Sequence, residues 1–186
     1  MPQVRKVEDD VLLERLIQTF KDVGYEGASL SALSEATGLK KSSLYHRFPE
    51  GKAQMAREVM AETARVLDAE VFPLLSADAA PDAKIGAFVR VMDGFYAGGR
   101  QSCLLNMLQP PRAETSACGE AIGETFSRLL GALAAVAREA GATPAQARLR
   151  AEQVLVELQG ALVVARGAND PGVFERMLKR LPAIIL

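Results

Sequence analysis

The sequence is poor in the side chains on which metal centres and disulfide frameworks depend. It contains two cysteines, Cys103 and Cys118, and a single histidine, His46. A disulfide framework and a cysteine-based zinc site both need more thiols than these, and a histidine-rich site needs more imidazoles. We therefore expect no metal and no cofactor. The two thiols are interpreted first as small packing residues and second as a redox pair.

Aromatic residues and long apolar runs are also scarce. Aromatics make up 5% of the chain, tryptophan is absent, and yet 49% of the residues are hydrophobic. Such a composition, rich in Ala and Leu, favours packed helices, so we expect an all-α fold. No window reaches the roughly 18 apolar residues of a membrane span. The N-terminal stretch lacks the apolar core of a targeting peptide, so a cytoplasmic protein is predicted.

The motifs of the commonest enzyme classes are missing as well. The sequence contains no Gly-x-Ser-x-Gly elbow, no P-loop and no dinucleotide fingerprint. Paired carboxylates such as Glu120 and Glu124 lie at helical spacing and are most simply a solvated helix face. We therefore expect a protein that is not an enzyme.

Three helices are predicted within the first fifty residues. Apolar residues recur with a 3.6-residue period at Leu13, Leu16, Ile17 and Phe20. Gly24 is a typical residue for the end of this helix. A second helix is expected from its N-cap Ser29 to Thr37, and a third from about Lys40 to Phe48. Because the two are joined across Gly38, they form a helix-turn-helix.

About six further helices are expected, which makes about nine in all. They span roughly residues 52–72, 81–96, 103–108, 119–140, 143–167 and 170–186. Thr143 to Gln146 reads as a capping box with proline at the first helical position. We place the domain boundary at the Pro49–Gly51 break, which gives domains of residues 1–50 and 51–186.

The segment from Lys40 to Arg57, which includes the third helix, carries the only strong charge asymmetry of the chain. Five basic residues, Lys40, Lys41, Arg47, Lys52 and Arg57, stand against Glu50 alone between positions 40 and 57. If Leu44 and Phe48 point inward, the opposite face presents Lys41, Ser42, Tyr45 and His46. A DNA major groove, about 12 Å wide, admits such a helix. The alternative is a solvated charged face without a partner.

The residues of this face divide into two predicted roles. Lys41 and Ser42, near the start of the helix, are candidates for contacts with base edges. Tyr45, His46 and Lys52 are candidates for phosphate contacts, which set the register without reading sequence.

The stretch LSALSEATGLKKSSLYHRFPEGKAQM, residues 30–55, resembles the helix-turn-helix of the tetracycline-repressor-like (TetR) family. The resemblance implies DNA contacts at Lys41, Ser42, Ser43, Tyr45, His46 and Lys52, with Ser29 at the phosphate-binding start of the second helix. Lys40 stands where the family usually has a Ser or Thr N-cap. The exchange weakens the cap by about 1 kcal/mol but adds a phosphate partner.

A helix-turn-helix of this size binds DNA as a dimer, so the rest of the chain should supply the dimer contact. Two apolar stripes on the last two helices are candidates: Val154, Leu158, Ala161, Leu162 and Ala165, and then Val173, Met177, Leu181 and Ile184. Two such helix pairs would form a four-helix bundle. The alternative is that these stripes are internal core.

The middle helices carry apolar and aromatic residues that suit a ligand: Phe88, Met92, Phe95, Tyr96, Met107 and Phe126. Each one taken singly is an ordinary core residue. The family resemblance implies a ligand pocket here, with Tyr96 as its polar group. It also implies a repressor that a small apolar or aromatic effector releases from a palindromic operator. The alternative is a helical carrier or interaction protein without DNA binding.

Overall fold

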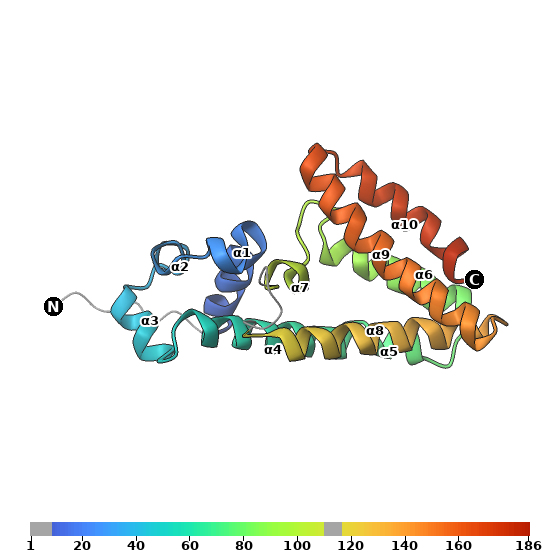
Figure 1. Cartoon of the computed structure of the whole chain (residues 1–186), viewed down its shortest axis with the longest axis horizontal. Helices are drawn as coiled ribbons and strands as arrows, with labels where there is room; N and C mark the ends of the chain where they lie inside the picture. The colour runs from blue at the N-terminus through green and yellow to red at the C-terminus, as the bar shows by residue number, and fades with distance from the viewer. Residues whose placement is uncertain (1–8, 110–116) are drawn as a thin grey trace. The chain divides into compact units, whose positions relative to one another are not determined.

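The structure, a computed structural model, describes residues 9–109 and 117–186, and these ranges contain helices and no strand (Figure 1). The all-α prediction is confirmed. The helices are α1 (Asp9–Gly27), α2 (Leu30–Thr37), α3 (Lys41–Arg47), α4 (Lys52–Glu70), α5 (Phe72–Ser76), α6 (Pro81–Phe95), α7 (Leu104–Met107), α8 (Gly119–Glu139), α9 (Pro144–Ala168) and α10 (Gly172–Ile185).

Most helix boundaries follow the caps, but α1 continues to Gly27, past the predicted end at Gly24, whose φ of 74° is not helical. The capping box at the start of α9 is present: the Thr143 Oγ1 accepts from the Gln146 N–H at 3.3 Å. The single helix expected over 52–72 is instead interrupted, because α4 ends at Glu70 and the short α5 follows. Pro73, the second residue of α5, lacks an N–H and would clash with the carbonyl four residues earlier in a continuous helix.

The chain divides into two compact units, of which the first contains Met1–Thr63 and Leu104–Gly119. The second contains Ala64–Cys103 and Glu120–Leu186. Helix α4 begins in the first unit and ends in the second. The functional boundary near residue 50 stays a prediction.

The described part of the first unit is built around a small apolar core. Leu16 and Phe20 of α1, Leu33 of α2, and Leu44 and Phe48 at α3 are all fully buried. Helix α7 packs on α1 in the same unit. The three helices of the predicted helix-turn-helix therefore share one core.

The second unit is dominated by the α9–α10 pair, whose helices lie side by side in Figure 1 and make the most extensive contact between any two helices of the described residues. Leu158 of α9 and Phe174 and Leu181 of α10 are buried between them and α6. No helix of the described ranges is both long enough and apolar enough to cross a membrane.

Candidate nucleic-acid interface

The turn between α2 and α3 is fixed by hydrogen bonds from both sides. Gly38 adopts a left-handed conformation, with φ 70°, and its N–H donates to the Glu35 carbonyl at 3.2 Å. Ser34 Oγ donates across the turn to the Leu39 carbonyl at 2.6 Å. Arg15 of α1 donates to the Thr37 carbonyl at 2.9 Å. The entry into α3 is thus defined by side-chain hydrogen bonds from α1 and α2 to backbone carbonyls of the turn.

Helix α3 has one buried side and one exposed side. Leu44 and the following Phe48 are fully buried. Lys41, Ser42, Tyr45 and His46 are exposed, and Tyr45 keeps 53% of its surface although it is a large aromatic residue. We call these four residues the donor face. Their exposure follows the predicted orientation of the helix, whereas their contacts with DNA stay a prediction.

Three further predicted contact residues, Ser29, Lys40 and Ser43, differ in their exposure and in their hydrogen bonds. Ser29 caps α2, because its Oγ accepts from the Ala32 N–H at 3.1 Å. Lys40 occupies the N-cap position of α3 and its side chain makes no capping hydrogen bond. Ser43 is half-buried.

Lys52, at the start of α4, is tied to the end of α1. Its Nζ donates to the Tyr25 carbonyl at 2.8 Å and lies 4.4 Å from the centroid of the Tyr25 ring. An ammonium group has three donors, so these contacts leave capacity for a phosphate oxygen. The side chain is nevertheless held in place as a link between two helices.

Two of the five basic residues that produce the local charge excess are neutralised within the chain. Arg57 pairs with Glu50 at 2.7 Å. Arg47 pairs with Glu58 at 2.9 Å, and its hydrogen bonds to that carboxylate raise the pKa of the guanidinium. The excess of positive charge predicted from the sequence is therefore smaller at the surface. Glu58, the residue after Arg57, supplies one of the neutralising carboxylates.

The predicted ligand residues are distributed over both units. Phe88, Met92 and Tyr96 are buried in the second unit, where Phe95 and Phe126 are half-buried. Met107 belongs to the first unit, with its backbone oxygen and its Cε both 3.4 Å from the position of a Cβ built on Gly24. Met107 thus packs on α1, a contact that was not predictable because α7 is a short helix whose partner lies far away in the chain.

Tyr96 is the centre of a polar cluster inside the second unit. Its hydroxyl donates to Cys103 Sγ at 3.5 Å, and Gln159 Nε2 donates to the same sulfur at 3.3 Å. The ring packs edge-to-face on Phe95 and Phe174, with centroids 5.3 and 5.7 Å away. Burial raises the pKa of Tyr96 well above its ordinary value. Gln159, which the sequence did not indicate, is a member of this cluster.

The two cysteines are both buried and unbridged, Cys103 in the second unit and Cys118 in the first. Burial raises the pKa of the Cys118 thiol, which disfavours the reactive thiolate. The burial of both side chains supports the packing interpretation over the redox pair.

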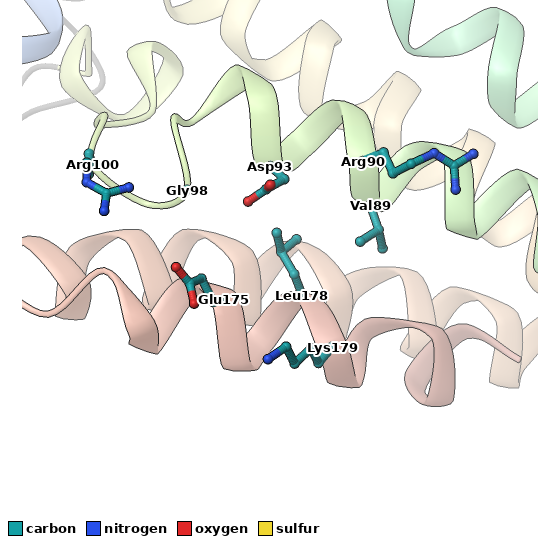
Figure 2. A pocket seen from close by; sticks show the side chains of 8 residues that line it. All are labelled: Val89, Arg90, Asp93, Gly98, Arg100, Glu175, Leu178 and Lys179. Carbon is teal, nitrogen blue, oxygen red and sulfur yellow. The ribbon is translucent and has the colours of Figure 1, made fainter.

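An open groove of about 520 Å³ lies between α6 and α10 and is seen in Figure 2. Its lining is mainly charged and contains none of the predicted ligand residues: Val89, Arg90, Asp93, Gly98, Arg100, Glu175, Leu178 and Lys179. The groove therefore differs in chemistry from the apolar pocket that the sequence led us to expect.

The predicted dimer stripe lies mostly inside the subunit, as the alternative interpretation anticipated. Seven of its side chains, Val154, Leu158, Ala161, Leu162, Ala165, Met177 and Leu181, are at most 8% exposed, and Val173 and Ile184 are half-buried. Such side chains have little surface to offer a partner. The exposed large apolar residues of α9 are Leu149 at 65%, Val156 at 70%, Val163 at 45% and Val164 at 52%.

The helix-turn-helix matches a known family. Residues 12–59 match the family model of "Bacterial regulatory proteins, tetR family". The HTH-type transcriptional regulator LmrA of Bacillus subtilis (strain 168) is 25% identical over 167 residues, which cover 86% of each chain.

Solved structures extend the similarity in fold to the whole chain. A TetR transcriptional regulator from Legionella pneumophila superposes with a TM-score of 0.81 at 18% identity, with 100% of each chain covered. A cysteine mutant of the TetR family regulator CifR, solved with a 26-base-pair operator DNA, gives 0.74 at 20% identity over 98% of each chain. At these identities the solved structures establish the fold of this chain.

Proposed function

We propose that this chain, whose residues 12–59 match the model of the tetR family of bacterial regulatory proteins, is a homodimeric repressor that a small molecule releases from its operator. The observation that carries the proposal is the donor face of α3. Four hydrogen-bonding side chains are exposed on a helix whose other side is fixed in the core. The hydroxyl of the exposed Tyr45 can donate to a DNA phosphate.

The contact roles follow from position on the helix. Lys41 and Ser42 lie at the N-terminal end of α3, which in this motif reaches base edges. Tyr45 and His46 lie a turn further on and suit phosphate oxygens. Lys52 is a second phosphate candidate, with its remaining ammonium donors. The proposed surface also includes three residues that would contact the sugar-phosphate backbone of DNA: Ser29, Lys40 and Ser43.

The effector is proposed to bind within the second unit. Tyr96 is its proposed polar contact, and Phe88, Met92, Phe95 and Phe126 are its proposed apolar neighbours. Met107, which packs on α1 in the first unit, stays a prediction from the sequence. An effector that binds one arrangement of these helices more tightly than another would lower the population of dimers able to bind DNA. We propose that the protein has no catalytic activity and acts in the cytoplasm.

The test is fluorescence anisotropy on duplexes from upstream of the protein's own gene, titrated with salt. Wild type should prefer one duplex over random DNA, and its affinity should fall steeply as salt is added. Lys41→Ala should lower the affinity for that duplex by roughly 10- to 100-fold, because a base contact is lost. It should also reduce the preference for that duplex over random DNA. Tyr45→Ala should weaken binding to all duplexes.

A matched control is Lys179→Ala, which removes an exposed lysine from α10 in the second unit and should leave binding unchanged. If wild type binds the upstream DNA no better than random DNA, selection from a random-sequence library decides between a distant operator and the carrier alternative. A selection that enriches nothing contradicts DNA-sequence recognition.

A further inference from the structure

Arg47 lies in α3, and both terminal nitrogens of its guanidinium group contact α4, whereas its Nε donates more weakly to Asp9 Oδ1 of α1 at 3.4 Å. Its Nη1 and Nη2 donate to Glu58 Oε1 at 3.2 Å and Oε2 at 2.9 Å. The two side chains retain only 35% and 29% of their surface. This fork geometry fixes both distance and orientation, which a lysine at the same position would not do.

The pair is part of a larger network at the start of α4. Gln54 donates from Nε2 to Glu58 Oε1 at 2.9 Å, and its Oε1 accepts from the Glu50 N–H at 3.1 Å. Glu50 in turn pairs with Arg57 at 2.7 Å. The network therefore connects the end of α3, the turn before α4, and the first turns of α4.

Helix α3 needs such a contact because it is short. It has seven residues, and its N-cap residue Lys40 makes no side-chain capping bond. A helix of this length is unstable by itself, so its orientation depends on tertiary contacts. Leu44 and Phe48 provide apolar contacts, which are non-directional, whereas the Arg47–Glu58 fork is directional.

We propose that Arg47 is a positioning residue, which holds the donor face of α3 at the angle required for DNA and does not itself contact DNA. The inference rests on the proposed function. It assigns opposite roles to basic residues of one helix: Lys41 faces the groove, and Arg47 faces Glu58.

Glu58→Gln is the most informative variant, because only a positioning role of Arg47 predicts that it lowers the affinity for DNA. Removing a negative charge near DNA should, by electrostatics alone, maintain or increase affinity. If Arg47 is a positioning residue, loss of the fork should decrease affinity by roughly tenfold, the size of a lost charge-assisted hydrogen bond. Glu35→Gln, an exposed carboxylate on α2, provides the purely electrostatic control.

The measurement is fluorescence anisotropy on a duplex recovered by random-library selection with the wild type. It is made at several salt concentrations and well below the melting temperature of the least stable variant. Arg47→Lys should also lower the affinity for this duplex roughly tenfold, although the substitution keeps the positive charge. The exchange of both residues, Arg47→Glu with Glu58→Arg, should recover much of the affinity that Arg47→Glu alone loses. The dependence of affinity on salt should stay that of wild type in Arg47→Lys and Glu58→Gln, since no phosphate contact is removed.

A direct phosphate contact predicts the reverse pattern and would overturn the proposal. Arg47→Lys and Glu58→Gln would then retain wild-type affinity, Arg47→Glu would reduce the salt slope by about one, and the exchange would not restore binding. Unaltered affinity in all variants would equally overturn it. If the selection with wild type yields no duplex, the proposed function fails first, so the two failures are distinguishable.

Discussion

At the scale of single residues, the role of a charge depends on the partner that the fold brings to it. Lys41 and Arg47 are both basic and both lie in α3, yet one is exposed and the other pairs with Glu58. The composition of the segment predicts a basic helix and the periodicity predicts its exposed side. The pairing was not predictable, because Glu58 is 11 residues away across a turn whose geometry the spacing does not reveal.

Tyr96 provides a prediction about pH. Burial raises the pKa of its hydroxyl above the ordinary value of 10.0, so the folded chain retains this proton to higher pH than the unfolded chain does. The resulting stabilisation is present below the unfolded pKa and is lost as pH rises above it. Melting curves between about pH 9 and 11 should therefore show a smaller loss of stability in Tyr96→Phe than in wild type.

The control for this comparison is Tyr45→Phe, since Tyr45 is 53% exposed. That variant should lose stability with pH as wild type does. An equal alkaline loss in Tyr96→Phe and wild type would show that other groups cause it.

At the scale of the elements, local signals in the sequence predicted most helix ends. The caps Ser29 and Thr143 and the left-handed Gly38 lie where the sequence placed them. Because each of these signals involves only a few neighbouring residues, it can be predicted from the sequence. The packing of α7 on α1 joins segments far apart in the chain, and for that reason the contact of Met107 with α1 was not predictable.

The turn after α6 offers a test of a local backbone requirement. Gly99 adopts φ +87°, and a Cβ built on it would lie 2.5 Å from the Cβ of Phe174 in α10. Gly99→Ala should therefore lower the free energy of unfolding by about 2 kcal/mol or more, through backbone strain and overpacking. Urea denaturation followed by circular dichroism measures this change.

Gly94→Ala is the matched control, because Gly94 lies in α6 and a Cβ there meets nothing within 4 Å. It should raise stability by about 0.5 to 1 kcal/mol, the usual gain of Ala over Gly in a helix. Wild-type stability in Gly99→Ala would mean that the turn can rearrange away from Phe174.

At the scale of the whole molecule, the sequence predicted a dimer contact on α9 from residues that the structure buries within the subunit. Val154, Leu158 and Leu162 are buried in the subunit, while Leu149, Val156 and Val163 are exposed. Both sets repeat at helical spacing. A helix that is apolar on two sides does not reveal from its sequence which side its own chain covers.

The exposed set predicts where two copies meet. Leu149, Val156 and Val163 are seven residues apart, so they lie along one side of α9, with Val164 beside them. An apolar stripe of this kind usually marks an interface, and in a two-fold dimer it would face its own copy. Such a dimer is needed to place two α3 helices on half-sites about 34 to 36 Å apart.

Val156→Glu should therefore convert the dimer into a monomer at micromolar concentration, because each copy would bury an unpaired carboxylate in the interface. Sedimentation equilibrium should give half the wild-type mass, and affinity for the selected duplex should fall as the second half-site contact is lost. Val23→Glu, which changes a valine on α1 that is 47% exposed, should keep the wild-type mass. A monomeric wild type, or a Val156→Glu variant that remains dimeric, would place the dimer contact on another surface of the chain.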